Sequence, residues 1–389
     1  MVSSNVRTMF AVHAVIMIIV RLWKSPQSDP IGALQLGERV LSDRIVIALD
    51  AMGGDRAPEV VVEGANISRE RFPNISFLMF GDRSRLKPLV EACPRLAAVT
   101  EYRHTTEMVS SEDKPSLALR SARGSSMRLA IEAVRDGEAC SVVSAGNTGA
   151  LMAIAKFVLK TMPGINRPAI TSYYPTMRGE SCMLDLGANV QCDAENLVQF
   201  AVMGEVFART VLGIEKPTIG LLNVGVESLK GRDEVRQAAA ILNETSLPIE
   251  FFGFVEGDDI PAGTVDVIVT DGFTGNVALK TAEGMTKLYT SFLRDAFKSS
   301  FSAKLGYLFI RRALNNLRQR TDPRLYNGAM LLGLNGIVIK SHGGTDNIGF
   351  ANAIGVGVDM AQHGFTDKIR QDFEGLSAGQ IEQKKAAVT

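Results

Sequence analysis

The stretch IVIALDAMGGDRAPEVVVEGA, at residues 45–65, contains the unit from which the fold can be predicted. It begins with a short apolar run, Ile45–Leu49, whose length and β-branched residues are typical of a buried strand. A polar, glycine-rich loop, Asp50–Asp55, follows. The next segment, Pro58–Arg71, has helical periodicity and a proline in its first turn. The stretch therefore predicts one strand–loop–helix unit of an α/β protein.

The same alternation continues along the chain. Further buried strands are expected at Ser76–Phe80, Ser141–Ser144, Ala169–Tyr173, Cys182–Leu184, Thr218–Leu222, Ile249–Phe252, Val265–Thr270 and Gly336–Ile339. Further helices are expected at Ala118–Arg135, Gly149–Thr161, Ala194–Val211 and Arg232–Leu242. Strands that alternate with helices build a mainly parallel sheet with helices on both faces. The sequence therefore predicts a three-layer α/β fold.

Composition supports a large folded core. The chain has 389 residues, of which 46% are hydrophobic, and this content excludes disordered and collagen-like classes. Single cores stop growing near ~250–300 residues, so we expect two domains or one large α/β unit. The 42 basic and 42 acidic residues balance, which argues against a globally basic nucleic-acid binder.

The cysteines and histidines form no recognisable metal-binding motif. No two cysteines stand in a CxxC pair, and the histidines are scattered along the chain. Zinc ligands usually come in closely spaced pairs, so we expect no bound metal and interpret the thiols as reduced. The residues concerned are Cys93, Cys140, Cys182, Cys192, His13, His104, His342 and His363.

The first 43 residues differ from the rest. Their apolar run, Phe10–Val20, is shorter than the ~20 residues that a membrane-spanning helix needs, and no small-residue cleavage site follows it. We expect residues 1–43 to be a disordered extension or the product of an upstream start codon, with a membrane-targeting segment as the alternative. Residues 44–364 are expected to form the main α/β unit, and residues 365–389 a C-terminal helix and tail.

Polar, glycine-rich loops follow six of the expected strands, at residues 50–55, 144–149, 185–189, 223–227, 271–276 and 340–346. In open α/β sheets, ligands bind beyond the carboxyl ends of the strands. Glycines let backbone amides approach a ligand, and helices that begin after Thr148 and Thr274 would attract an anion. Ordinary turns are the alternative. Six such loops at corresponding strand ends favour one convergent anion site.

Several common nucleotide and hydrolase motifs are absent. The sequence contains no GxxxxGK[ST], no GxGxxG after an expected strand, no GxSxG and no HExxH. The expected ligand is therefore a phosphate-sized anion held by amides, hydroxyls and a few cations.

These loops, in this order, resemble those of the bacterial phosphate acyltransferases of phospholipid synthesis. The resemblance runs from about Ile45 to Ala361. It departs from the family pattern at Arg56, where many relatives have histidine, and at the weakly basic stretch 120–123, so neither is assigned a contact. Its segments are IALDAMGGDRAPEVVVEGA, SSM at 125–127, SAGNTGALMA, NRPAI, LDLGANV, GLLNVGVESLKG, VDVIVTDGFTGNVALKTAEG and IVIKSHGGTD.

The resemblance implies an enzyme that makes acyl phosphate from inorganic phosphate and a long-chain acyl thioester of acyl carrier protein, without a cofactor or a metal. It also implies a cytoplasmic homodimer, peripherally associated with the inner face of the membrane, whose product passes to a glycerol-3-phosphate acyltransferase. A more distant similarity to phosphotransacetylases lies in Asp271, Gly275, Asn276 and Lys280 and in the loop 342–346. That similarity implies a two-domain fold related to isocitrate and isopropylmalate dehydrogenases, with a cleft between the domains.

For this reaction we expect His342, Lys280 and Asp271 at the catalytic centre. His342 lies between Ser341 and two glycines, which suits an oxyanion donor or a phosphate contact better than core packing. Lys280 could equally pair with Glu283, three residues on in the same helix. Asp271 could equally cap the helix that follows it.

The expected substrate-binding residues are mostly polar residues and glycines of the strand-end loops. Two of the aspartates, Asp50 and Asp185, could instead cap helices. The set is Asp50, Gly53, Gly54, Ser125, Ser126, Asn147, Thr148, Gly149, Asp185, Asn189, Asn223, Thr274, Gly275, Asn276 and Gly343.

The segment Met285–Arg320 carries two apolar runs with helical spacing. The first run suits a core helix or a dimer seam. The second has six basic residues and no acidic one between Ala296 and Thr321, which suits an anionic membrane surface or an acidic carrier protein, with a solvated face as the alternative. The residues expected to make these contacts are Lys304, Arg311, Arg312, Arg318 and Arg320.

Other functions remain open at this point. One is a phosphotransacetylase-like enzyme that uses acyl-CoA, and another is a non-enzymatic peripheral membrane scaffold built on the basic helix. A hydride-transferring dehydrogenase is less favoured because the glycine fingerprint is missing.

Overall fold

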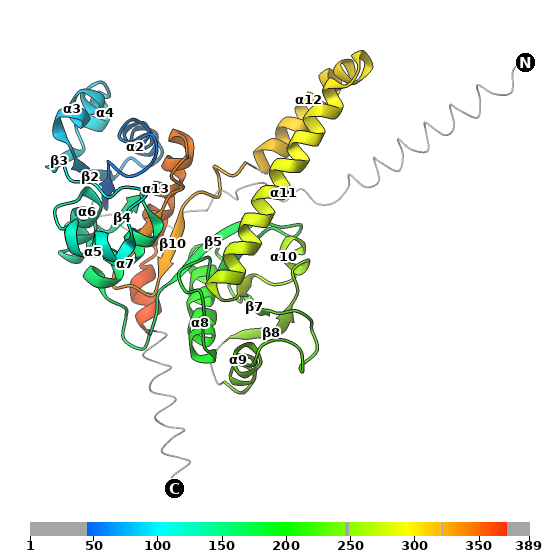
Figure 1. The fold of residues 1–389 in the computed structure, drawn as a ribbon. Helices are drawn as coiled ribbons and strands as arrows, with labels where there is room; N and C mark the ends of the chain where they lie inside the picture. The colour runs from blue at the N-terminus through cyan, green and yellow to red at the C-terminus, as the bar shows by residue number, and fades with distance from the viewer. Residues whose placement is uncertain (1–44, 246–248, 321, 372–389) are drawn as a thin grey trace, which may run out of the picture. The chain divides into compact units, whose positions relative to one another are not determined.

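A computed structural model describes residues 45–245, 249–320 and 322–371, apart from the side chains of residues 316 and 318–320. The extension at 1–43 and most of the tail lie outside this part of the chain. In the described residues eleven strands form one sheet, in the order β3-β2-β1-β4-β11-β10-β5-β6-β9-β7-β8 (Figure 1). The strands are β1 Ile45–Asp50, β2 Ile75–Gly81, β3 Thr100–His104, β4 Ser141–Ser144, β5 Ala169–Pro175, β6 Glu180–Leu184, β7 Thr218–Leu222, β8 Glu250–Val255, β9 Val267–Val269, β10 Ala329–Leu332 and β11 Ile337–Lys340.

The sheet is mainly parallel, as the sequence predicts. Strand β10 pairs antiparallel with β11 and with β5, and β5 pairs antiparallel with β6. The other neighbouring strands run parallel. Three reversals in a row mean that the half β3-β2-β1-β4-β11 and the half β6-β9-β7-β8 run in opposite directions.

Helices cover both faces of the sheet, so the three-layer arrangement is confirmed. Alternate residues of a strand point to opposite faces: in β1, Ile47 and Leu49 join one buried apolar cluster and Ala48 the other. Buried residues of α2, α8, α9 and α13 belong to the first cluster and those of α6 and α7 to the second. The helices are α2 Glu59–Arg71, α3 Arg83–Glu91, α4 Pro94–Ala97, α5 Pro115–Ser121, α6 Ser126–Arg135, α7 Thr148–Leu159, α8 Ala194–Thr210, α9 Asp233–Glu244, α10 Asp259–Ala262, α11 Gly272–Lys298, α12 Phe301–Arg320 and α13 Asn347–Gln362.

Four details of the sequence prediction are wrong. The expected helix Ala118–Arg135 is two helices, α5 and α6. The first ends at Ser121, and Ser125 caps the second by accepting from the N–H of Arg128 at 3.3 Å. Strands β3 and β10 were not expected. Strand β8, expected to be buried, is partly exposed because it lies at an edge of the sheet.

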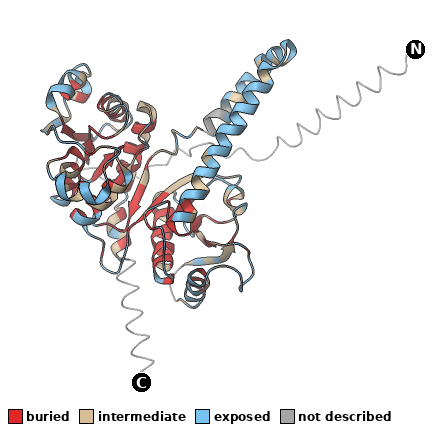
Figure 2. Cartoon of the chain, in the orientation of Figure 1, coloured by how far each residue is buried: buried red, intermediate tan, exposed pale blue. Residues whose placement is uncertain are grey.

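Helices α11 and α12 pack together as a helical hairpin, with the rings of Phe297 and Tyr307 5.6 Å apart between centroids. Most residues of the hairpin are exposed (Figure 2), and in α11 only Gly272 and Gly275 are buried. The interpretation of its first apolar run as a core helix is therefore wrong for this chain. After α13, Phe365 and Ile369 return to the main core.

Candidate functional site

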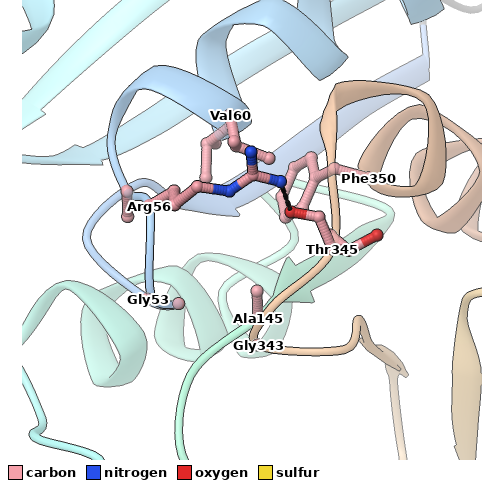
Figure 3. Close-up of a pocket in the computed structure, with 10 residues that line it drawn as sticks. Gly53, Arg56, Val60, Ala145, Gly343, Thr345 and Phe350 are labelled. Carbon is pink, nitrogen blue, oxygen red and sulfur yellow. Dashed lines mark hydrogen bonds between the residues drawn. The ribbon is translucent and has the colours of Figure 1, made fainter.

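The loops after β1, β4 and β11 meet at one edge of the sheet. These three strands are neighbours, and the N–H of Asp55 donates to the carbonyl of Gly343 at 3.0 Å. Gly53, Gly54 and Gly343 line a small pocket there (Figure 3). Gly54 has a φ of +109°, a conformation that residues with a Cβ rarely adopt. We call these three loops the first loop group.

Arg56 also lines this pocket, and its guanidinium donates to the carbonyl of Thr345 at 2.6 Å (Figure 3). The residue that departs from the family pattern thus ties the loop after β1 to the loop after β11.

Asp50 is the buried centre of the first loop group. Its carboxylate accepts from the hydroxyls of Ser126 and Ser144, both at 2.6 Å. Burial raises the pKa of Asp50, while the two serines, the backbone and the charge of Lys340 oppose that rise. The N-cap of the next helix, α2, is Pro58, so the helix-capping alternative for Asp50 is wrong.

Lys340 was not among the predicted site residues. It ends β11, in register with Ser144 of β4, and is half-buried. Its ammonium donates to the carbonyls of Ala145, at 3.4 Å, and of Ser341. Burial lowers the pKa of Lys340 to about 8; repulsion by Lys280 adds to this, and attraction by Asp50 and Asp55 opposes it. A lysine that ends an apolar strand is the signal that could have identified it.

His342 is exposed in the loop after β11. Its backbone N–H donates to Oδ1 of Asn327 at 2.9 Å, and its Nδ1 accepts from the N–H of Gly344 at 3.1 Å. In a neutral ring the proton therefore lies on Nε2, where it can be donated to a ligand.

The loops after β6, β7 and β9 form a second loop group. The N–H of Gly272 donates to the carbonyl of Asn189 at 2.7 Å, and Arg232, just before α9, forms an ion pair with Asp271. Arg232 was missed because it follows its strand by ten residues.

The second loop group does not lie at the same sheet edge as the first. The two halves of the sheet run in opposite directions, so their carboxyl ends lie at opposite edges. The expectation of six loops at corresponding ends is therefore wrong. Helix α11 compensates in part, because it starts in the second loop group and brings Lys280 close enough to lower the pKa of Lys340.

Asp185 organises the loop after β6 and does not cap a helix, because Asp193 caps α8. Its buried carboxylate accepts from the N–H groups of Ile170, Ala188 and Asn189 at 2.6–3.1 Å. Burial raises the pKa of Asp185, against those hydrogen bonds. The Asn189 amide donates to Asp185 and to the carbonyl of Pro168. Both predicted residues thus hold backbone in place.

Asp271 caps α11, as its alternative interpretation predicts. It accepts from the N–H and the hydroxyl of Thr274 at 2.9 and 2.8 Å. Burial would raise the pKa of Asp271, but Thr274 and Arg232 outweigh it and the pKa is lowered. Its carboxylate is thus ionised and fully engaged.

The first turns of α11 sit close against the loop after β6. A Cβ at Gly275 would lie 2.0 Å from the carbonyl oxygen of Asp185, so only glycine fits. Asn276 is exposed beside Gly187. Lys280 pairs with Glu283 at 2.8 Å, as its alternative interpretation predicts, yet about half of its side chain stays exposed.

The remaining predicted polar residues mainly support the fold. Asn147 caps α7 and donates to three carbonyls of the segment 110–113. Asn223 donates to the carbonyls of Gly225 and Lys230 and closes its loop. Thr148 and Gly149 form the first turn of α7, where Thr148 is exposed.

The basic face of α12 is exposed at Lys304, Arg311 and Arg312. Arg318 and Arg320 lie in the same helix, with side chains outside the described part. No helix in the described residues combines the length and apolar character needed to cross a bilayer.

Comparisons with known proteins agree with this geometry. A family model described as "Fatty acid synthesis protein" matches residues 45–368. A phosphate acyltransferase of Rhodospirillum centenum is 64% identical over 338 residues, which cover 87% of this chain and 95% of that protein. One of Paramagnetospirillum magneticum is 60% identical over 347 residues, covering 89% and 99%.

Two solved structures share the fold. A phosphotransacetylase from Streptococcus pyogenes superposes with a TM-score of 0.57 at 18% identity, over 83% of this chain and 95% of that one. A branched-chain phosphotransacylase from Enterococcus faecalis gives 0.51 at 13% identity, over 82% and 99%.

Proposed function

The chain belongs to the phosphate acyltransferase family, and we propose that it transfers a long-chain acyl group from acyl carrier protein to inorganic phosphate, as a step of phospholipid synthesis. As a member of that family it is an enzyme. The observation that carries the proposal is the first loop group, where the loop with Gly53 and Gly54 meets the loop with Lys340 and His342. The charge of Lys280, on α11, also acts on Lys340 there. Cations and backbone amides at one place suit a phosphate dianion.

The proposed reaction asks the protein mainly for positioning. An oxygen of the bound phosphate attacks the thioester carbonyl carbon, the C–S bond breaks, and the carrier thiolate takes a proton from solvent. Holding the two reactants together supplies much of the rate. The Nε2–H of His342 would stabilise the negative oxygen that forms on the carbonyl. This scheme needs no covalent enzyme intermediate and no metal.

An exposed apolar surface on the second loop group supports the proposal that the substrate carries a long acyl chain. Phe273, Val277 and Lys280 stand at helical spacing on one side of α11. In the loop after β7, which belongs to the same loop group, Leu229 and Val226 are 84% and 60% exposed. Apolar patches of this kind mark binding surfaces. The acyl chain would therefore run from Lys280 along α11 toward the loop after β7.

Chain-length dependence tests this path. Phe273→Asn should raise the KM for a long-chain acyl substrate severalfold and leave that for an acetyl substrate unchanged, because only the long chain reaches the residue. Phe301→Asn, which alters an exposed aromatic residue on α12, is the matched control. An equal effect of Phe273→Asn on both substrates would exclude the path.

The hairpin of α11 and α12 supports a homodimer. Met285, Leu288, Tyr289, Phe292 and Leu293 recur at helical spacing and are each at least 42% exposed. A second copy of the same hairpin would cover this stripe. Sedimentation of the purified chain should give the dimer mass. Substitution of Leu288 and Phe292 with Glu should give monomers, and a wild-type monomer would contradict the proposal.

The basic face of α12 is proposed to contact anionic partners, namely acyl carrier protein or the inner face of the membrane. A product with a long apolar tail and a phosphate head suits release at that surface, where a glycerol-3-phosphate acyltransferase would take it up. We therefore propose that the enzyme is cytoplasmic and peripherally bound to the membrane.

The choice of acyl donor separates the main proposal from its nearest alternative. Turnover should be measured with acyl carrier protein and with coenzyme A carrying the same long-chain acyl group. We expect a higher kcat/KM with the carrier protein. Turnover with acyl-CoA alone would favour a phosphotransacetylase-like enzyme. No turnover with either, together with vesicle binding that survives loop substitutions, would favour a membrane scaffold.

A further inference from the structure

We propose that Lys340 binds the phosphate substrate directly, and that Asp50 is a positioning residue that keeps Lys340 charged and in place. This inference rests on the proposed function, since it names the group that receives the phosphate. It adds a residue of the loop 340–346 that is not among the site residues predicted from the sequence.

The strand register places Lys340 at the first loop group. Lys340 of β11 is paired with Ser144 of β4, and the preceding pair in the next ladder, Leu49 with Val143, puts Asp50 beside Ser144. Asp50, Ser144 and Lys340 therefore form a row across three adjacent strand ends. The hydroxyl of Ser144 donates to the carboxylate of Asp50 at 2.6 Å, which fixes these two residues relative to each other.

The ammonium of Lys340 is incompletely satisfied by the protein. It has three N–H donors, and two carbonyls, of Ala145 and Ser341, accept from it. Among the described residues no carboxylate forms an ion pair with it; Asp50 and Asp55 act on it only from a longer distance. Even a half-buried charge without a direct counter-ion is costly, and a bound anion would reduce that cost.

The surrounding charges favour an anion between two lysines. Lys280 of α11 repels Lys340, and Asp50 and Asp55 attract it. Each carboxylate oxygen of Asp50 accepts from a serine hydroxyl, and these two hydrogen bonds fix the orientation of the carboxylate. A phosphate dianion between Lys340 and Lys280 would relieve their repulsion. A neutral thioester carbonyl would not, and so phosphate is the substrate assigned here.

The same geometry predicts how phosphate binding depends on pH. Lys340, with a pKa of about 8, is protonated below that pH and loses its proton above it. The neutral amine attracts a dianion much less, so the KM for phosphate should rise as the pH increases beyond about 8. The KM for the acyl substrate should not follow this change.

Steady-state kinetics would test the proposal on four single variants. The measurements should run from about pH 6.5 to about pH 9.5, roughly one and a half units on either side of the pKa of Lys340. Lys340→Met should raise the phosphate KM about 10-fold to 100-fold, as expected for loss of one charged hydrogen bond, and remove the rise in that KM above about pH 8. Lys340→Arg stays charged throughout, so its phosphate KM should be closer to wild type and should not rise above about pH 8. Lys87→Met, on the exposed face of α3, is the control and should match wild type.

Asp50→Asn tests the positioning role. The asparagine keeps an acceptor for a serine but loses the charge that attracts Lys340, so the rise in phosphate KM should begin at a lower pH than in wild type. A purely structural role would reduce kcat or stability without moving that pH. Combining Asp50→Asn with Lys340→Arg should abolish the shift.

A wild-type phosphate KM in folded Lys340→Met would overturn the proposal, and so would an unchanged pH dependence in Lys340→Arg. If Lys340→Met does not fold, Lys340→Arg decides alone. Calorimetric titration with inorganic phosphate, without acyl substrate, separates this proposal from the reaction. Phosphate binding that depends on Lys340 in a chain that forms no acyl phosphate would refute only the proposed function.

Discussion

His342 is held in position by hydrogen bonds although it is exposed. Its backbone is held by Asn327 and its Nδ1 by the N–H of Gly344, so Nε2 is the nitrogen that faces outward as a donor. Asn327 in turn donates to the hydroxyl of Ser341 and the carbonyl of Gly349, which ties the loop to the start of α13. The ring is thus oriented from both sides.

Removal of that ring should affect turnover and spare the fold. We expect His342→Ala to lower acyl phosphate formation by ~10²-fold or more, the scale of losing an oxyanion donor. The exposed position of His342 means that thermal unfolding should shift little. His342→Gln, which retains an N–H donor, should recover part of the rate. Near-normal turnover of folded His342→Ala would remove the residue from the site.

At the scale of elements, the first turns of α11 and the rest of that helix make different contacts. Its first turns are anchored in the second loop group by Asp271, Thr274 and Gly275. The rest of α11 pairs with α12 in the exposed hairpin, where the apolar stripe and the basic face lie. The helix therefore links the proposed chemistry to the proposed docking surface.

The basic face of α12 predicts that binding to anionic partners weakens as the salt concentration rises. Each basic residue near an anionic surface contributes about 1 kcal/mol, screened over a Debye length of about 8–10 Å. Replacing Arg311, Arg312 and Arg318 with Gln should weaken binding to anionic vesicles or raise the KM for acyl carrier protein at low salt. The phosphate KM should stay at the wild-type value. No change in either vesicle binding or carrier KM would mean that this face is merely solvated.

At the scale of the whole molecule, the sequence predicts the fold class and most elements but not the direction of the sheet halves. Apolar runs such as Thr218–Leu222, which are bounded by turn residues, are recognised as buried strands from the local pattern alone. Strand β10 is only four residues long and follows a helical hairpin, so its antiparallel insertion leaves no local signal. The net reversal, however, comes from the antiparallel pairing of β5 with β6, and assuming that these two strands run parallel led to the wrong expectation that all six loops share one edge.

Some residues of the site can be predicted from the sequence, and others cannot because their partners lie far away along the chain. Residues that hold the loops, such as Asp50 and Asp185, were identified because polar groups at strand ends are conspicuous in a sequence. Lys340 and Arg232 act through partners from distant segments, Asp50 and Asp271, and only the folded register brings those partners together.

We expect turnover to be independent of metal ions, which is a prediction about the whole molecule. The proposed site neutralises phosphate with Lys280, Lys340 and backbone amides, so a divalent ion would have no role. Dialysis against a strong chelator should leave turnover intact. Activity that is lost on dialysis and restored by a divalent cation would show that the charge is supplied in another way.

The most direct measurement of the central claim is the product balance of the purified full chain. Long-chain acyl carrier protein and inorganic phosphate should be mixed without added metal, with the released carrier thiol and the acyl phosphate measured in the same sample. The account predicts that the two appear in equal amounts and that both depend on phosphate. Thiol release without acyl phosphate, or no release at all, would contradict it.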